Sequence, residues 1–470
     1  MSPDRRKESF YANKVILAPM VRVGTLPMRL LSLRYGADLV YSEEIIDFKL
    51  IKSRRYVNEE SKTIDFIDES GFVVFRTNDE EKSKVIVQIG TNDPTRAVLA
   101  AKMVEDDVAG IDINMGCPKS FSLKGGMGAA LLTNPDMIHD ILTQLKANIK
   151  KPVSCKIRVL PDLNATLDLV RMIQKTGVDA IAVHGRTKDE RPRDPNRDEF
   201  IRAIVDNVQI PVIANGASSE IRCYSDIEKF KTRVRASSVM IARAAMKNCS
   251  LFDKNGKRVN DIEDLIKQYL RLSIQFDNNA MNTKYCIQQM LGPLQELDRG
   301  KQFIGSYDLE TMSKIYELHE YYIQTEDERN SKKIVPNDLP KPMVNKEGQI
   351  DVIELPIVFD KNLFEFKTLP KNILNRFITQ NKMERPKIRT YQVEKQYHSV
   401  IQFMDKTYST PYLEKAKRLS EQSATLVLLI SLGLFADRSV IDKCLVSEHN
   451  IVHALQHFEN GKVYYIKINK

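Results

Sequence analysis

The sequence predicts an α/β protein: a (β/α)8 (TIM) barrel, then a small helical domain, then a compact unit of order α-β-β-β-α. The first observation is a series of eight short apolar runs, most of them separated by room for one helix, as in 95–104 and 165–176. Apolar strands that alternate with helices are typical of a parallel sheet, and eight such units make a barrel. The second observation is that helical spacing of apolar residues replaces this pattern after residue 243. The eight runs cover residues 15–20, 39–44, 85–90, 111–114, 153–158, 180–184, 212–216 and 238–243.

The composition is that of an intracellular protein with a basic balance. The chain has 470 residues and a net charge of +9, which favours a polyanionic partner where the charge is clustered. Its six cysteines, at 117, 155, 223, 249, 286 and 444, include no C-x-x-C pair, so neither a zinc site nor a disulfide framework is indicated. The charged N-terminus has no apolar signal core, and no apolar run is long enough for a membrane span. We expect a cytoplasmic monomer, with a nuclear pool as a variant, that has no metal and no membrane anchor.

The gap between the second and third runs is too long for a simple crossover. Within it, residues 63–75 contain two apolar stretches that flank a Glu-Ser-Gly turn. This arrangement predicts an inserted hairpin.

Each apolar run ends in side chains that can do chemistry. A barrel gathers these ends at its C-terminal face, where the active sites of this fold lie. Taken singly, His184 is as well explained as a core histidine, Lys156 as a solvated lysine and Gln88 as a strand cap. Together they favour a site at one rim. The residues are Pro19 and Met20, Glu43 and Glu44, Gln88, Asn114 with Cys117, Lys156 with Arg158, His184 with Arg186, Asn215 with Gly216, and Arg243.

The centre of this predicted site is the stretch 110–118, which begins as a strand and stops at Asn-Met-Gly-Cys-Pro. Gly116 lets the backbone approach a ligand, and Pro118 prevents the strand from continuing. A second loop of little bulk follows at 125–128. Cys117 between such loops suits proton or thiolate chemistry, and the alternative is a buried structural cysteine.

The rim also suggests a phosphorylated ligand. Asn215, Gly216 and Ala217 follow the seventh run, and Ala242 and Arg243 end the eighth. In such barrels these loops form a phosphate site from backbone N–H groups and a helix N-terminus, to which an arginine adds a charged contact. The sequence contains neither G-x-G-x-x-G nor a Walker loop.

These strings resemble the tRNA-dihydrouridine synthase family over about residues 12–330. The similarity is carried by Ala-Pro-Met at 18–20, Gln-Ile-Gly at 88–90, Asn-Met-Gly-Cys-Pro at 114–118, Lys-Gly-Gly-Met-Gly at 124–128, Lys-Ile-Arg at 156–158, His-Gly-Arg-Thr at 184–187 and Ala-Asn-Gly at 214–216. Residues 41–44 and 238–246 are similar to the eukaryotic branch that modifies position 20 of the D-loop.

The resemblance implies FMN on the barrel mouth, with NADPH or NADH as the reductant. It assigns Pro19, Met20 and Val21 to the isoalloxazine and Gln88 and Lys156 to the polar edge of that ring. The ribityl chain and phosphate go to His184, Asn215, Gly216, Ala217, Ala242 and Arg243. Ala217 and Ala242 depart from the family, where glycine is common.

The resemblance also implies the reaction. A tRNA uridine is flipped out onto the flavin and receives a hydride at C6, and Cys117 gives a proton to C5 as a general acid. Lys156 helps to stabilise the enolate. Contacts with the substrate RNA are expected from Glu43, Asn114, Arg158 and Arg186.

The predicted domains are a catalytic barrel over 12–250, a helical domain over 251–326, a linker over 327–360, an RNA-binding domain over 361–437 and an extension over 438–470 without an assigned role. The RNA-binding domain rests on a helix at 369–379, strands at 387–392, 398–403 and 406–409, and a helix at 411–433. This order, with the basic start of the second helix, resembles a double-stranded-RNA-binding domain (dsRBD).

The charge of this segment agrees with that resemblance. Residues 367–419 hold twelve Lys and Arg against four acids, an excess of eight that nearly equals the whole chain's +9. Lys371, Lys415, Lys417 and Arg418 are the expected phosphate contacts. The alternative is an ordinary solvated basic face.

The sequence thus predicts an FMN-dependent tRNA-dihydrouridine synthase. One alternative is a barrel flavoprotein that reduces a free pyrimidine, such as a dihydroorotate dehydrogenase relative; the basic C-terminal domain argues against it. Another is a non-catalytic or regulatory RNA-binding flavoprotein, against which the set of Cys117, Lys156 and His184 argues.

Overall fold

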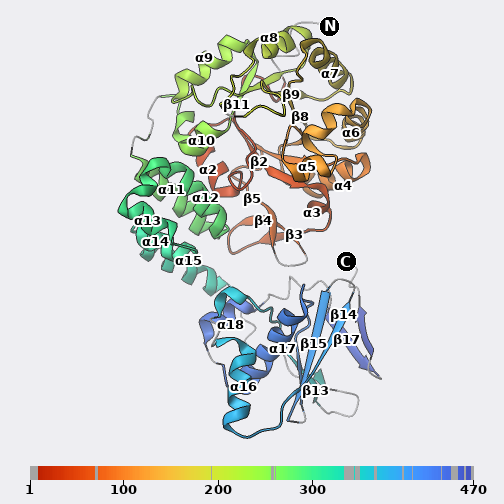
Figure 1. Cartoon of the computed structure of the whole chain (residues 1–470), viewed down its shortest axis with the longest axis vertical. Coiled ribbons are helices and arrows are strands. Elements are labelled where there is room, and N and C mark those ends of the chain that lie inside the picture. Colours follow the sequence, from red (N-terminus) through yellow and green to blue (C-terminus); the bar gives the residue numbers. More distant parts are fainter. Residues whose placement is uncertain are drawn as a thin grey trace. The chain divides into compact units, whose positions relative to one another are not determined.

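The computed structural model consists of two compact units (Figure 1). The first unit holds the described residues up to Lys332, and the second holds those from Met343 onward. The described residues are 9–68, 72–191, 193–255, 259, 261–332, 343–344, 350–364, 368–393, 396–404, 406–435, 437–445, 454–459 and 462–466.

The first unit is built on a closed barrel of eight parallel strands, which confirms the predicted fold class. Each strand pairs with its neighbours in the order β1-β11-β10-β9-β8-β7-β6-β2, and the β1–β2 pairing closes the ring. The strands are β1 (Val15–Leu17), β2 (Leu39–Ile46), β6 (Val85–Gly90), β7 (Gly110–Met115), β8 (Val153–Arg158), β9 (Ala180–His184), β10 (Val212–Asn215) and β11 (Ser238–Ile241).

Helices surround this barrel, and local sequence signals start several of them. The side chains of Asp93, Asn134 and Asp162 each accept a hydrogen bond from a first-turn N–H, and proline follows the first two at the next position. The helices are α2 (Leu26–Arg34), α3 (Asp47–Ile51), α4 (Pro94–Val104), α5 (Ser120–Lys124), α6 (Pro135–Asn148), α7 (Leu163–Lys175), α8 (Asp198–Asn207), α9 (Tyr224–Val234) and α10 (Arg243–Lys247).

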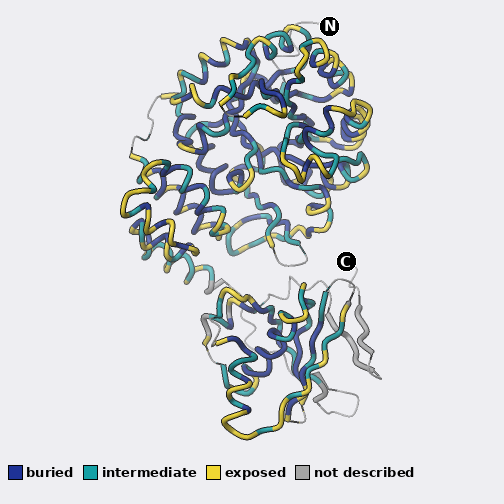
Figure 2. Tube along the Cα trace, viewed as in Figure 1, coloured by how far each residue is buried: buried dark blue, intermediate teal, exposed yellow. Residues whose placement is uncertain are grey.

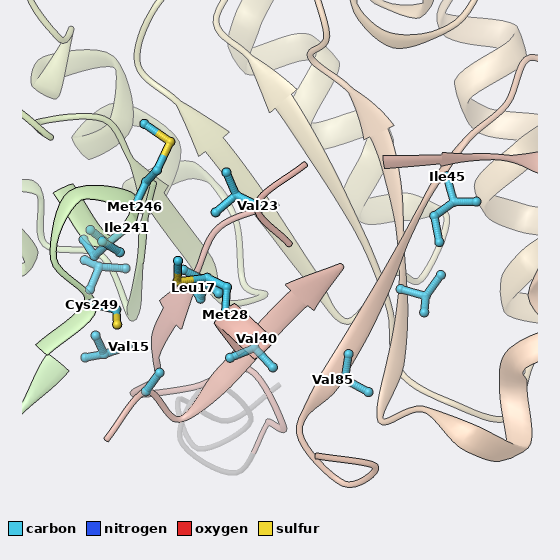
Figure 3. Close-up of a cluster of buried hydrophobic side chains, with 14 of the residues drawn as sticks. Val15, Leu17, Val23, Met28, Val40, Ile45, Val85, Ile241, Met246 and Cys249 are labelled. Atoms are coloured by element: carbon cyan, nitrogen blue, oxygen red, sulfur yellow. The ribbon is translucent and has the colours of Figure 1, made fainter. Parts of the chain in front are cut away.

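Alternation along the strands divides the core into two layers. Residues that are partners across neighbouring strands, such as Tyr41 with Ile86 and Ala182 with Ile213, belong to a buried cluster inside the barrel. The intervening strand residues pack outward against the helices; Figure 3 shows Leu17 and Val40 in one cluster with Met28 of α2. Parity along each strand therefore decides which side chains reach the interior.

The insertion between β2 and β6 is a three-stranded antiparallel sheet of β3 (Arg54–Asn58), β4 (Thr63–Ile67) and β5 (Val73–Thr77). The predicted hairpin corresponds to β4 and β5, whose connecting residues 69–71 lie outside the described residues. Strand β3 was not predicted from the sequence, because its residues are mostly polar and exposed.

Helices after the barrel form a bundle within the same unit. Leu265, Tyr269 and Leu272, predicted to share one apolar face, are buried. The helices are α11 (Ile262–Gln275), α12 (Ala280–Leu291), α13 (Asp298–Ile304), α14 (Leu309–Ile315) and α15 (His319–Lys332). Helix α15 extends into the predicted linker.

The second unit contains the predicted α-β-β-β-α order and adds strands to it. Its sheet has the order β12-β13-β16-β15-β14, and α17, whose residues are mostly buried, packs on β15 and β16 (Figure 2). The elements are β12 (Met343–Val344), β13 (Ile350–Glu354), α16 (Pro370–Gln380), β14 (Lys387–Val393), β15 (Gln396–Phe403), β16 (Lys406–Ser409) and α17 (Lys417–Ser431). Strand β13 lies within the predicted linker, and the extension at 438–470 holds α18 (Arg438–Cys444), β17 (Ala454–Glu459) and β18 (Lys462–Ile466).

The prediction that the last dsRBD helix begins at Pro411 was wrong, because α17 begins at Lys417. Glu414 makes an antiparallel bridge with Tyr397, with both backbone hydrogen bonds formed, so the chain is still extended at this point. The Glu414 carboxylate also accepts a hydrogen bond from the Ser423 hydroxyl at 2.6 Å. Among the described residues, no helix combines the length and the apolarity that a bilayer crossing needs.

Candidate functional site

The functional side chains reach the barrel mouth because they continue the inward-facing positions of the strands. Gln88 lies two residues after Ile86 and is the partner of Asp112, while Lys156 is the partner of Asn114 and of Ala182. On the next strands, Arg158 pairs with His184, and His184 with Asn215. The structure therefore brings these strand-end residues to one rim, as predicted from their positions.

A chain of hydrogen bonds fixes the side chains in the centre of the mouth. The Gln88 amide donates to Asp112 Oδ2 at 2.8 Å, and its carbonyl oxygen accepts from Asn114 Nδ2 at 2.9 Å. The Asn114 oxygen in turn accepts from the backbone N–H of Cys117 at 2.9 Å. Burial raises the pKa of Asp112 to about 6, against the lowering effect of its hydrogen bonds with Gln88 and Ser154. These hydrogen bonds fix the orientations of the Gln88 and Asn114 side-chain amides, and the Cys117 backbone is bonded to Asn114.

Cys117 lies half-buried where β7 ends, against the loop that precedes α6. Its carbonyl oxygen accepts from the N–H of Ala129, and Gly128 packs so close that an added Cβ would lie 2.9 Å from Cys117 Cβ. Burial, followed by the charge of Glu44, raises the pKa of the Cys117 thiol. The side chain is therefore held as a protonated thiol at neutral pH, which is the state of a proton donor.

Positive charge is concentrated beside this thiol. Burial lowers the pKa of Lys156 to about 8, with Arg158 as the next cause. Burial and then the nearby cations also lower the pKa of His184 well below its usual value, so its ring is neutral. Arg158 donates to the carbonyls of Gly116 and Thr187, and Arg186 Nη1 lies 3.1 Å from His184 Nε2. Such crowding of cations favours the binding of an anion at the mouth.

The loops after β10 and β11 have the backbone expected of a ligand cradle. Gly216 has φ +141 and Ala217 has φ +49. Ala217 thus adopts a left-handed backbone conformation, which glycine would adopt without strain. The side chain of Asn196 packs on Gly185 and Gly216, where no Cβ would fit, and its Oδ1 is buried without a hydrogen-bond partner. Asn215 donates to the Met240 carbonyl at 2.8 Å, and Arg243, half-buried beside Ala242, opens the short helix α10.

The loop after β1 carries the remaining predicted mouth residues. Pro19 and Met20 are half-buried, whereas Val21 is 56% exposed. Glu43 accepts a hydrogen bond from the backbone N–H of Arg22 at 2.9 Å, so it fixes this loop. Its predicted contact with the substrate stays a prediction.

The predicted RNA contacts Lys371, Lys415, Lys417 and Arg418 belong to the second unit. Lys415, Lys417 and Arg418 are exposed around the start of α17. Lys371 differs, because its Nζ forms an ion pair with Glu421 at 2.7 Å and its backbone N–H donates to Gln422. Part of its charge is therefore already compensated within the domain.

Four residues at the mouth were not assigned a role from the sequence: Glu44, Asp112, Ser122 and Asn196. Asp112 is fully buried and sits on the inward face of β7, which strand parity alone could have indicated. Ser122 lies in the short helix α5 and Asn196 on a loop, and no sequence pattern marks them. Within the described residues, no cluster of His, Cys, Asp or Glu could hold a metal ion.

The chain is similar to known proteins. The profile of a family described as dihydrouridine synthase (Dus) matches residues 16–319. A Schizosaccharomyces pombe protein, named an NAD(P)+ tRNA-dihydrouridine(20) synthase, is 43% identical over 292 residues, which make up 60% of this chain and 60% of that protein. A Saccharomyces cerevisiae protein of the same name is 39% identical over 298 residues, 60% of this chain and 78% of that one.

The second unit is similar to a solved domain. A mutant of the dsRBD of human tRNA-dihydrouridine(20) synthase is 27% identical, with 17% of this chain and 88% of that chain covered and a TM-score of 0.17.

Proposed function

The chain belongs to the dihydrouridine synthase family, and from this premise we propose that it reduces the C5–C6 bond of a D-loop uridine, at position 20, in tRNA. The relatives that carry this activity in their names are 43% and 39% identical to the chain. The observation that carries the proposal is the Cys117 thiol, held protonated at the barrel mouth beside closely spaced cations.

The residues of the mouth fit FMN as the cofactor. The fixed amide of Gln88 and the Lys156 ammonium suit the polar edge of a flavin ring, with Pro19, Met20 and Val21 beside it. Arg243 suits a phosphate, and Asn196 Oδ1 is a buried acceptor that a ribityl hydroxyl would satisfy. His184, Asn215, Gly216, Ala217 and Ala242 would complete this part of the site. When bound, FMN would supply the hydride for C6 of the base, after reduction by NADPH or NADH.

The chain's own residues would then position the base and move the proton. Cys117 Sγ–H would protonate C5, and Lys156, still charged at pH 7 with a pKa of about 8, would stabilise negative charge that develops on the carbonyl oxygen of the base. Asn114 fixes the Cys117 backbone through its 2.9 Å hydrogen bond. Arg158 and Arg186 add a positive field that holds the polynucleotide at the rim.

We assign the second unit to tRNA binding outside the mouth. Its α-β-β-β-α order presents Lys415, Lys417 and Arg418 on an exposed surface near the first turn of α17. A cluster of this kind suits the phosphates of duplex RNA, and a basic anchor is of no use to an enzyme acting on a free pyrimidine. We further propose a monomer in the cytoplasm, where the six free thiols would stay reduced.

The test incubates purified protein with NADPH and a tRNA transcript, followed by digestion and mass spectrometry. A gain of two hydrogens at the position-20 uridine is expected. A gain at another D-loop uridine would contradict the assigned position. A yellow protein that NADPH bleaches, but that leaves both transcript and native unmodified tRNA unchanged, would contradict the substrate. A colourless protein that binds tRNA without reducing it would favour the non-catalytic alternative.

A further inference from the structure

We propose that Glu44, together with Ser122, is a positioning residue that returns a proton to Cys117 after each turnover. The inference rests on the proposed function and deepens it, because a general acid that has given up its proton must be recharged before it can act again. Glu44 does not lie among the residues that would contact flavin or base; it would act through Cys117.

A β-bulge directs Glu44 into the barrel mouth. Strand β2 advances three residues between Tyr41 and Glu44 while β6 advances two, from Ile86 to Gln88. The extra residue reverses the parity, so Glu44 shares the inward face with Tyr41 and Gln88, and Ile45 packs outward in the core. Bulges commonly re-aim a side chain next to an active site.

A glycine provides the space that this carboxyl occupies. A Cβ added at Gly90 would lie 2.6 Å from Glu44 Oε1 and 3.2 Å from Glu44 Cγ. The Glu44 side chain therefore lies directly over the inner surface of β6, where only glycine leaves room for it. From this position the carboxyl interacts with the Cys117 and Ser122 side chains.

Two buried oxygen atoms lie next to Cys117. Glu44 Oε1 and Ser122 Oγ are both inaccessible to solvent, and the polar groups within their reach include each other and the Cys117 thiol. Ser122 belongs to α5, and the same added Cβ at Gly128 that would touch Cys117 Cβ at 2.9 Å would touch Ser122 Oγ at 3.2 Å. A carboxyl group buried beside a thiol without well-formed hydrogen bonds is costly, so this arrangement calls for a functional explanation.

The charged groups around this pair are few. Glu44 interacts with Cys117 and Ser122, and Cys117 with Glu44, Lys156 and Arg158. Burial raises the pKa of the Glu44 carboxyl above its ordinary 4.5, and burial with Glu44 raises that of the thiol above 9.0. In its ordinary range a carboxylic acid is much more acidic than a thiol, so Glu44 has the chemistry to protonate the thiolate.

The step balances without a redox change. Cys117 S–H gives its proton to the base, which leaves a thiolate. The Glu44 carboxylate then takes a proton from solvent, with the Ser122 hydroxyl as the adjacent donor and acceptor. Its new O–H bond breaks as an S–H bond forms on Cys117, and Glu44 is again a carboxylate.

The test compares Glu44→Gln with Glu199→Gln, an exposed control on α8. In the flavin-loaded, pre-reduced enzyme, Glu44→Gln should form product in the first turnover at about the wild-type rate, because Cys117 already holds its proton. Its steady-state rate should fall about 10²-fold. Acetate at high concentration should restore part of that rate, since Cys117 is partly accessible. Ser122→Ala should show a smaller loss of the same kind.

A second readout does not depend on turnover. Loss of the Glu44 charge should lower the midpoint of Cys117 alkylation by iodoacetamide, followed by mass spectrometry across pH. An unchanged alkylation midpoint in Glu44→Gln overturns the coupling between Glu44 and Cys117, whether or not the wild type reduces tRNA. Failure of the wild type to reduce tRNA would contradict the proposed function and is a separate result. If Glu44→Gln lowered the first-turnover rate as much as the steady-state rate, or if acetate restored no activity, Glu44 would have a structural role and the proposal would be overturned.

Discussion

Replacing Gly128 by alanine is the sharpest steric test of how the loop positions Cys117. The Cβ of Gly128→Ala would lie 2.7 Å from the Cys117 carbonyl oxygen and 2.9 Å from Cys117 Cβ. Neither neighbour is the flexible end of a side chain. Because ordinary contact begins at 3.4 Å, Cys117 itself must move away from the loop.

The size of the effect follows from two contributions. Gly128 has φ +58, and alanine in this conformation costs about 1 kcal/mol. Overpacking adds about 1–3 kcal/mol. A displacement of about half an ångström at the proton donor should lower the rate of uridine reduction roughly tenfold or more, since 1 Å of misplacement can cost about 10²-fold.

Gly177→Ala is the matched control, because Gly177 has φ +83 but no atom within 4 Å of its added Cβ. Both variants should lose the backbone contribution in denaturant unfolding, and only Gly128→Ala should lose more. Single-turnover reduction of tRNA, with flavin content measured beside it, reports the displacement of Cys117. A Gly128→Ala protein with the stability of Gly177→Ala and the wild-type single-turnover rate would refute this steric account.

Three further predictions concern stability, pH and RNA. Glu81→Ala leaves Arg29, which is 1% exposed, without its carboxylate partner and should lower the free energy of unfolding by about 3–5 kcal/mol. Glu80→Ala removes the exposed ion pair with Arg34 and should lower it by less than about 1 kcal/mol. Equal losses would contradict the argument from burial. The pKa of Lys156 is about 8 in the folded protein and 10.5 in the unfolded chain, so burying its charge destabilises the fold fully below pH 8. The free energy of unfolding should therefore rise as the pH increases from 8 toward 10.5. In unfolding measurements between pH 7 and 10, Lys156→Met should lack this rise. Lys415→Glu with Lys417→Glu should weaken tRNA binding and flatten its salt dependence while flavin reduction by NADPH is unchanged, and an unaltered salt slope would count against the assigned surface.

The barrel could be predicted because its strands are buried on both sides. Eight apolar runs of this kind leave few other arrangements, and the strand-end positions of Gln88, Lys156 and His184 followed from them. Strand β3 escaped prediction because its pattern is polar and its stability comes from pairing with β4. The start of α17 was placed too early because the Pro411 signal is overridden by the Tyr397–Glu414 bridge, a contact between distant residues.

The bulge in β2 decides which of two adjacent glutamates, both expected at the rim, faces the barrel mouth. Regular alternation from Tyr41 would turn Glu43 inward and Glu44 outward. One extra residue reverses this, so that Glu44 faces the mouth while Glu43 fixes the loop at Arg22. A register shift of this kind depends on pairing with β6 and leaves no mark in a single sequence.

The most direct test of Cys117 as the proton donor is a comparison of Cys117→Ala with the wild type in a single turnover on tRNA. Flavin content and flavin reduction by NADPH should be equal in the two proteins, because Cys117 lies outside the groups assigned to the cofactor. Formation of dihydrouridine should fall by about 10²-fold or more, since the proton donor is gone. Unchanged product formation from the Cys117→Ala protein would contradict the assignment of Cys117 as the acid.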